Sequence, residues 1–220
     1  KDKRFIKYAK KFNRDGYVII NLKVSKKDLK KTIEDISSLA KAEDVKKNPK
    51  IYHYNKNPRI VEGYKKFKSI KNLCRNKEII NILKYFYEKK PVPINSINFI
   101  KGTDQPLHSD YIHFSSMPHK YLCAAWIALE ETDEKNGPII VVPGSHKFDL
   151  VDYSLFNLKT PTSMQELSRF YKVYETYVNK LVKLKKIKTK TLKLQPGQAV
   201  IWAANLLHGG KKIIDQSRTR

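Results

Sequence analysis

The sequence predicts a mainly β protein with flanking helices, of the α+β type. From Ile94 onward the chain consists of short β-like runs, which turn pairs such as Pro143-Gly144 and Pro196-Gly197 separate. Helices do not alternate with these runs, as they would in a protein built on a parallel sheet. Many short strands without alternating helices indicate an antiparallel sandwich or a small barrel.

Residues 1–93 are expected to support that core with helices and strands. Apolar residues recur at helical spacing after Ser25, which can act as the N-cap of a helix. The turn at Asp15-Gly16 separates a first helix from a β-branched run. In chain order we expect a helix over Phe5–Phe12, a strand over Tyr17–Leu22, a helix over Lys26–Ala42, a loop over Glu43–Arg59 with a short strand at Ile51–Tyr54, and a helix over Lys77–Glu88.

Residues 94–220 are expected to form the β core. The expected strands are Ile94–Ile100, His108–Phe114, Tyr121–Leu129, Ile139–Val142, Thr189–Leu194 and Ala199–Ala203. One helical insertion, at about residues 163–184, interrupts the series. No internal repeat and no low-complexity linker divides the chain, so we expect residues 1–220 to form a single domain with one active site.

Composition excludes a membrane-spanning protein and a disulfide-built one. No apolar run approaches the roughly 18 residues that cross a bilayer. Lys1–Lys11 is charged and has no apolar stretch of the kind that marks a secretory signal. Cys74 and Cys123 lie far apart in the sequence, which favours two reduced, mostly buried thiols in a cytoplasmic protein.

The net charge of +24 suggests nucleic acid as a partner, because clustered Lys and Arg neutralise phosphates. The basic residues are mostly Lys, however, and are scattered along almost the whole chain together with abundant Ile and Asn. That pattern is typical of codon bias and of a solvated surface. We therefore expect no specific nucleic-acid partner. The densest basic stretch, Lys180–Lys193, could attract an anionic substrate.

Three polar residues can form a metal site. His108 and Asp110 are separated by one residue, so on an extended strand both side chains project from the same face. His208 follows an apolar run and precedes Gly209-Gly210, where the chain can turn sharply. Two neutral imidazoles and one carboxylate on a β-scaffold are the facial triad of non-haem iron(II) oxygenases, which leaves coordination positions open for reactants.

Two arginines follow the second histidine at a suitable distance to hold a carboxylate cosubstrate such as 2-oxoglutarate. Arg218 and Arg220 come ten and twelve residues after His208, and on a strand they would share a face. A guanidinium can bind a carboxylate through two hydrogen bonds. Either arginine could serve.

Two further residues near these positions have ordinary structural interpretations. His113 lies an odd number of residues from Asp110, so on a regular strand it would face away from the metal, and we interpret it as packing or as the rim of a pocket. Trp202 alternates on a hydrophobic strand and is interpreted as a core residue.

Several ordered motifs resemble the phytanoyl-CoA dioxygenase family of iron(II)- and 2-oxoglutarate-dependent oxygenases. The resemblance covers nearly the whole chain, and the joint occurrence of the motifs in order is highly specific. The motifs are Phe12 with Asp15-Gly16-Tyr17-Val18, Gln105-Pro106-Leu107-His108-Ser109-Asp110, Trp126-Ile127-Ala128-Leu129-Glu130, Asn136-Gly137-Pro138 through Pro143-Gly144-Ser145-His146-Lys147, and Leu207-His208-Gly209-Gly210 with Arg220.

The resemblance implies a double-stranded β-helix, the jelly-roll or cupin-like barrel, with N-terminal helices. It carries the metal ligands onto His108, Asp110 and His208, and the 2-oxoglutarate arginine best onto Arg220, with Arg218 as the second choice. Trp126 matches a tryptophan of the cosubstrate pocket. Family members continue past the arginine with further strand, so we expect the last barrel strand to be missing or disordered here.

Two polar residues near the first ligand are weaker cosubstrate candidates. Gln105 and Asn98 lie on or near the strand that leads to His108, where polar neighbours of the cosubstrate are common in the family.

The activity that the resemblance implies is hydroxylation of a small organic substrate. It would use Fe(II), 2-oxoglutarate and O2, with oxidative decarboxylation of 2-oxoglutarate to succinate and CO2. Two alternatives belong to other classes. A non-catalytic or divergent cupin-like metal-binding protein would keep the fold without needing the arginine. A nucleic-acid-directed oxygenase would explain the charge, but no base-stacking motif or recognition helix supports it.

Overall fold

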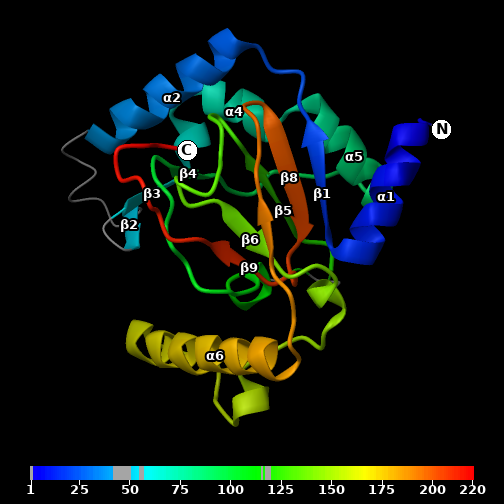
Figure 1. Ribbon diagram of the computed structural model, residues 1–220, viewed down its shortest axis with the longest axis vertical. Helices are drawn as coiled ribbons and strands as arrows, with labels where there is room; N and C mark the ends of the chain where they lie inside the picture. Colours follow the sequence, from blue (N-terminus) through cyan, green and yellow to red (C-terminus); the bar gives the residue numbers. More distant parts are fainter. Residues whose placement is uncertain (1, 42–50, 55–56, 115, 117–119) are drawn as a thin grey trace.

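A computed structural model describes residues 2–41, 51–54, 57–114, 116 and 120–220. Its centre consists of two antiparallel sheets that face each other (Figure 1). The first sheet has the strand order β1-β8-β5 and the second has the order β7-β6-β9. The strands are β1 (Tyr17–Asn21), β5 (Cys123–Ile127), β6 (Ile139–Val141), β7 (Lys190–Leu192), β8 (Gln198–Ala203) and β9 (His208–Gly210).

Strand β8 is the middle of the first sheet and is buried on both faces. Successive side chains of a strand point to opposite faces. Val200 and Trp202 therefore face the second sheet, where they join Val141 and Leu192 in one buried cluster. Ile201, on the other face, packs beneath the N-terminal helices. This double burial explains why the sequence of β8 is almost continuously apolar.

Two helices cover the outer face of the first sheet. They are α1 (Lys3–Asp15) and α5 (Lys77–Tyr87) (Figure 1). Helix α1 is longer than expected because the Asp2 carboxylate caps it, accepting a hydrogen bond from the Arg4 backbone N–H at 2.9 Å. At its other end Gly16 has a φ of 81°, a left-handed conformation that glycine adopts without strain.

A third sheet with two more helices lies on the side of the C-terminus (Figure 1). Its order is β2-β3-β4, with β2 (Ile51–Tyr54), β3 (Asn57–Val61) and β4 (Ile97–Phe99), and the helices are α2 (Lys26–Lys41) and α4 (Lys68–Cys74). Helix α4 and strand β3 were not expected. The strand expected to begin at Ile94 begins at Ile97, because its partner β3 ends opposite this residue at Val61. The expected loop over Glu43–Arg59 lies partly outside the described residues.

The strand expected over His108–Phe114 is wrong. The chain makes one isolated antiparallel bridge, between His108 and His208, and then turns into a 3-10 helix over Asp110–Ile112. The backbone N–H groups of His113 and Phe114 both donate to the Asp110 carbonyl, at 2.9 and 2.8 Å. The turn therefore occupies two backbone N–H groups and one carbonyl that would otherwise pair with a neighbouring strand.

The expected helical insertion is confirmed as α6 (Met164–Leu184). The Ser163 hydroxyl caps it by accepting from the Glu166 backbone N–H at 3.2 Å, and the Glu166 carboxylate accepts from the Thr162 N–H at 2.8 Å. The helix forms a layer of its own below the two central sheets (Figure 1). None of the helices in the described part of the chain combines the length and apolarity needed to cross a lipid bilayer.

Candidate metal centre

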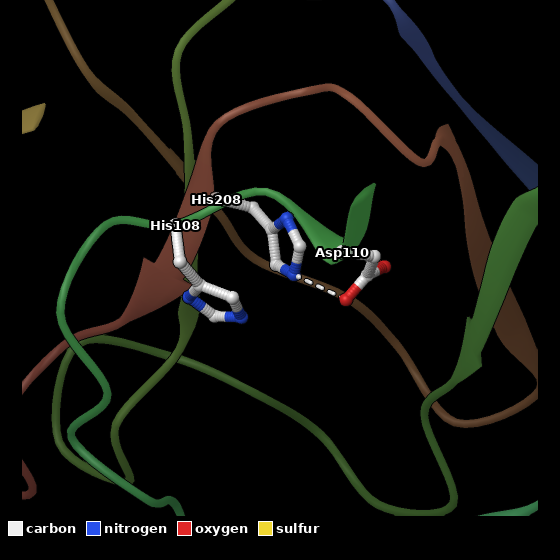
Figure 2. A group of neighbouring side chains, drawn as sticks. All are labelled: His108, Asp110 and His208. Carbon is white, nitrogen blue, oxygen red and sulfur yellow. Dashed lines mark ion pairs between the residues drawn. The ribbon is translucent and has the colours of Figure 1, made fainter. Parts of the chain in front are cut away.

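The imidazoles of His108 and His208 lie close together where β9 pairs with the segment before the 3-10 helix (Figure 2). His108 and His208 exchange two backbone hydrogen bonds, each of 2.8 Å, and their ring centroids are 4.4 Å apart. Directly opposed residues of an antiparallel pair project their side chains on the same side. The close approach requires Gly209, because a Cβ there would lie 2.7 Å from the Gln105 carbonyl oxygen.

Both imidazoles are oriented in the same way by the backbone. Nδ1 of His108 lies 2.8 Å from the Pro106 carbonyl oxygen, and Nδ1 of His208 lies 3.0 Å from the Leu206 carbonyl oxygen. A carbonyl oxygen can only accept, so each Nδ1 carries a proton, and in the neutral ring it is Nε2 that can bind a metal. Hydrogen bonds of this kind fix the tautomer and the ring orientation of metal-binding histidines.

The carboxylate of Asp110 completes the group. Its Oδ1 lies 3.5 Å from Nε2 of His208, and its Oδ2 accepts a hydrogen bond of 2.8 Å from the indole N–H of Trp202 (Figure 2). One oxygen is therefore held by the protein while the other faces the histidines. The expected convergence of His108 and Asp110 is present, but a turn produces it, not alternation along a strand.

These three side chains fit a divalent metal ion. One potential ligand atom from each lies within 4.8 Å of the other two. Burial lowers the pKa of His108 well below its ordinary value, and His208 lowers it further. His108 is consequently neutral near pH 7, as a ligand must be. Two imidazole nitrogens and one carboxylate oxygen are the donor set of non-haem iron(II) sites with open positions.

Arg220 is the better placed of the two candidate arginines. Its side chain is buried, it donates from Nη1 to the Gly137 carbonyl, and its guanidinium lies 5.5 Å from the centroid of the Trp126 ring. Its Nε is buried and has no hydrogen-bond partner within the described residues, so a donor is available for a carboxylate. Burial, with a smaller contribution from Arg59, lowers the pKa of Arg220 to about 10, which leaves it charged at pH 7.

Arg218 points elsewhere. Its Nη1 forms an ion pair of 2.6 Å with Asp133. The segment that carries the two arginines is not a strand, so the expectation that they share a strand face is wrong.

The two weaker candidates, Gln105 and Asn98, make protein contacts. The Gln105 side-chain oxygen accepts from Nη2 of Arg59, and the Asn98 amide donates to the Ile60 carbonyl at 2.9 Å. Asn98 thereby fastens β4 to β3. Gln105 contacts Arg59, and the charge of Arg59 in turn acts on His108.

Three contributors to the site were not expected from the sequence. Trp202 is a core residue, as expected, but its N–H also holds Asp110; the available signal was that a buried indole N–H needs an acceptor. Arg59 lies on the unexpected strand β3, and its positive charge helps to lower the pKa of both His108 and Arg220. Tyr174 of α6 hydrogen-bonds Ser109 between the two ligands.

His113 lies beside the metal group. Its ring centroid is 5.8 Å from that of His108, its Nδ1 is 2.8 Å from the Tyr171 hydroxyl, and it is exposed. The expectation that His113 faces away from the metal is wrong, because the chain turns into the 3-10 helix here; its role as packing or as the rim of a pocket stays a prediction.

Comparison with known proteins identifies the family. Residues 12–219 match the family described as "Phytanoyl-CoA dioxygenase (PhyH)". The chain belongs to the phytanoyl-CoA dioxygenase family. A probable phytanoyl-CoA dioxygenase of Caenorhabditis elegans is 27% identical over 104 residues, which are 47% of this chain and 30% of that protein. A probable alpha-ketoglutarate-dependent hypophosphite dioxygenase of Stutzerimonas stutzeri is 32% identical over 106 residues, 47% of this chain and 36% of that protein.

The matched stretch therefore spans about a third of each of these two relatives. Among solved structures, EctD from S. alaskensis with bound Fe superposes with a TM-score of 0.71 at 18% identity, covering 94% of this chain and 71% of that chain. At this identity the likeness concerns the fold alone. Together with the two facing sheets it confirms the expected jelly-roll, cupin-like fold with flanking helices.

Trp202→Phe tests the hydrogen bond to Asp110. The substitution keeps an aromatic ring beside His208 but removes the only N–H of the side chain, so Asp110 loses its fixed orientation. Loss of such a contact typically weakens metal binding about 10-fold or more. Anaerobic calorimetric titration with Fe(II) measures the affinity. Trp126→Phe is the matched control, because this tryptophan lies over Arg220; equal affinities in the two variants would contradict the assigned role.

Proposed function

We propose that the chain is an Fe(II)- and 2-oxoglutarate-dependent dioxygenase that hydroxylates a small organic substrate. The observation that carries the proposal is the group of His108, Asp110 and His208, with both Nε2 lone pairs and one carboxylate oxygen turned toward each other. Family membership and the name of the Stutzerimonas stutzeri relative support the same chemistry. In the overall reaction O2 gives one oxygen atom to the substrate and one to succinate, and CO2 leaves.

Each residue has a separate task in this proposal. His108, Asp110 and His208 would hold iron(II), which would supply the redox chemistry that O2 and 2-oxoglutarate need. The Pro106 and Leu206 carbonyls keep both imidazoles in the tautomer that binds a metal. The Trp202 N–H keeps one oxygen of Asp110 turned toward the site. The burial of His108 and His208 keeps bulk water from the protein side of the ligands.

Arg220 is proposed to hold the carboxylate of 2-oxoglutarate that is distant from the keto acid. Arg220 is a buried cation whose Nε has no hydrogen-bond partner within the described residues. The desolvation of such a cation is costly unless an anion binds it. The Trp126 ring forms one wall beside this cation. A metal-binding protein without catalysis would have no need for this arrangement.

We further propose an anionic group on the substrate. Arg59 brings a second cation close to His108, His113 and Arg220, since it contributes to the pKa shifts of all three. The excess charge of the whole chain would attract such a molecule. No nucleic-acid partner is proposed.

A cytoplasmic location is also proposed. Cys74 and Cys123 are both free and partly buried, as is usual in a reducing compartment. Thiol labelling in freshly lysed cells measures the oxidation state of these two cysteines and so tests the proposed location. Labelling that occurs only after reduction would overturn the proposal.

Anaerobic titration with Fe(II) and 2-oxoglutarate tests the activity. The ternary complex should show the weak metal-to-ligand absorption band of iron-bound 2-oxoglutarate. His108→Ala should abolish the band, because a buried ligand is lost. A wild-type protein without the band at saturating ligand would refute the iron and 2-oxoglutarate assignment.

The two arginines provide a matched pair for the cosubstrate. Arg220→Ala should raise the dissociation constant for 2-oxoglutarate by about 10- to 100-fold, as expected for a charged hydrogen bond worth roughly 1.5–3 kcal/mol. Arg218→Ala removes the same charge from a half-buried ion pair with Asp133 and should change that constant by less than about threefold. The constant is read from the absorption band at fixed Fe(II). Equal effects of the two substitutions would reject Arg220.

Succinate release tests the substrate class. Pools of small molecules that carry a carboxylate, phosphate or phosphonate group should stimulate release above the uncoupled rate, and neutral or cationic pools should not. Arg59→Met should reduce this stimulation, because the second cation is lost while the metal ligands remain. Stimulation by neutral molecules alone would overturn the anionic assignment and leave the reaction class intact.

A further inference from the structure

Helix α6 packs against the β core through one buried stripe. Phe170, Tyr174 and Val178 are spaced four residues apart, so they lie on one side of the helix, and all three are almost fully buried. Together with Leu107, Val142 and Leu207 they form one apolar cluster. The ribbon shows this helix as a separate layer outside the two central sheets (Figure 1).

The residues that this stripe meets are sequence neighbours of the metal group. Leu107 directly precedes His108, and Leu207 directly precedes His208. The Tyr174 hydroxyl oxygen accepts a hydrogen bond of 2.9 Å from the backbone N–H of Ser109, the residue between His108 and Asp110. It also lies 3.0 Å from the Ser109 hydroxyl. Helix α6 therefore contacts a neighbour of each of the three ligand residues.

Apolar packing does not explain the hydroxyl of Tyr174. A phenylalanine would fill the same cluster without bringing a polar group into it, and a buried hydroxyl is costly unless it is hydrogen-bonded. The Ser109 N–H has the same requirement. It is buried at the point where the chain leaves its single bridge and turns into the 3-10 helix, so it has no strand partner. The Tyr174 hydroxyl takes the place of that partner.

A second contact joins α6 to the same segment. The Tyr171 hydroxyl lies 2.8 Å from Nδ1 of His113, just beyond the 3-10 helix that carries Asp110. Tyr171 and Tyr174 are three residues apart and hence on adjacent parts of one helix face. The turn that carries Asp110 is thus fastened to α6 at both of its ends.

We propose that Tyr174 is a positioning residue of the metal centre: its hydroxyl fixes the backbone between His108 and Asp110 and so sets the relative placement of these two ligands. The inference rests on the proposed metal site. Thermodynamic coupling is reciprocal, so metal binding should in turn stabilise the docking of α6 against the core.

Tyr174→Phe removes only the hydroxyl and keeps the apolar packing. Anaerobic Fe(II) titration should show an affinity about 10-fold lower than that of the wild type. The Fe(II) and 2-oxoglutarate absorption band, measured at saturating Fe(II), should shift or broaden, which a general loss of stability would not cause. Tyr177→Phe is the matched control: it removes the same group from the same helix at a residue whose ring packs against Phe156, and it should match the wild type.

Hydrogen exchange gives a readout that does not depend on activity. Mn(II) should slow the exchange of the α6 backbone amides in the wild type and in Tyr177→Phe, and much less in Tyr174→Phe. If Tyr174→Phe binds Fe(II) within twofold of the wild type with an unchanged band, the positioning role is overturned. A wild type that gives no band at all would instead refute the proposed function, so the two failures are distinguishable.

Discussion

The metal centre depends on one reciprocal pair of backbone hydrogen bonds, between His108 and His208. The two residues are a hundred positions apart, and this single bridge places both imidazoles on one side of the chain. Regular pairing does not continue on the His108 side, so the bridge cannot hold the site by itself. Gly209 makes the close approach possible, and the carbonyls of Pro106 and Leu206 fix the two rings.

The groups around the ligands follow from the requirement that buried polar atoms be paired. Each histidine donates its Nδ1 proton to a backbone carbonyl. One oxygen of Asp110 accepts from the Trp202 N–H, and the Ser109 N–H donates to the hydroxyl of Tyr174 in α6. The atoms that remain are Nε2 of each histidine and the second oxygen of Asp110, which lies 3.5 Å from Nε2 of His208. A divalent cation between these three atoms would bind all of them at once. The pairing pattern is therefore itself an argument for a metal ion.

Local signals in the sequence predicted most of the elements and the composition of the site. Turn residues and apolar runs located β1, β5, β6, β7 and β8 with small shifts at their ends, and Ser25 marked the start of α2. Contacts between distant segments were not predictable in this way. The segment after His108 has the composition of a strand, yet it turns because its partners are the Asp110 carbonyl and Tyr174. Arg59 was missed because β3, which contains a proline, carries no strand signal.

The outcome for His108 and Asp110 shows how a correct prediction that two side chains converge can follow from an incorrect local structure. Alternation along a strand and a bridge followed by a turn both bring residues two apart to one side, so the spacing alone cannot distinguish them. The difference matters for what holds the ligands. On a strand, neighbouring strands of the barrel would fix the spacing; here an inserted helix does so through one hydroxyl. Sequence changes in α6 can therefore alter the metal centre while all three ligands stay the same, and a comparison restricted to the ligand motif would not detect them.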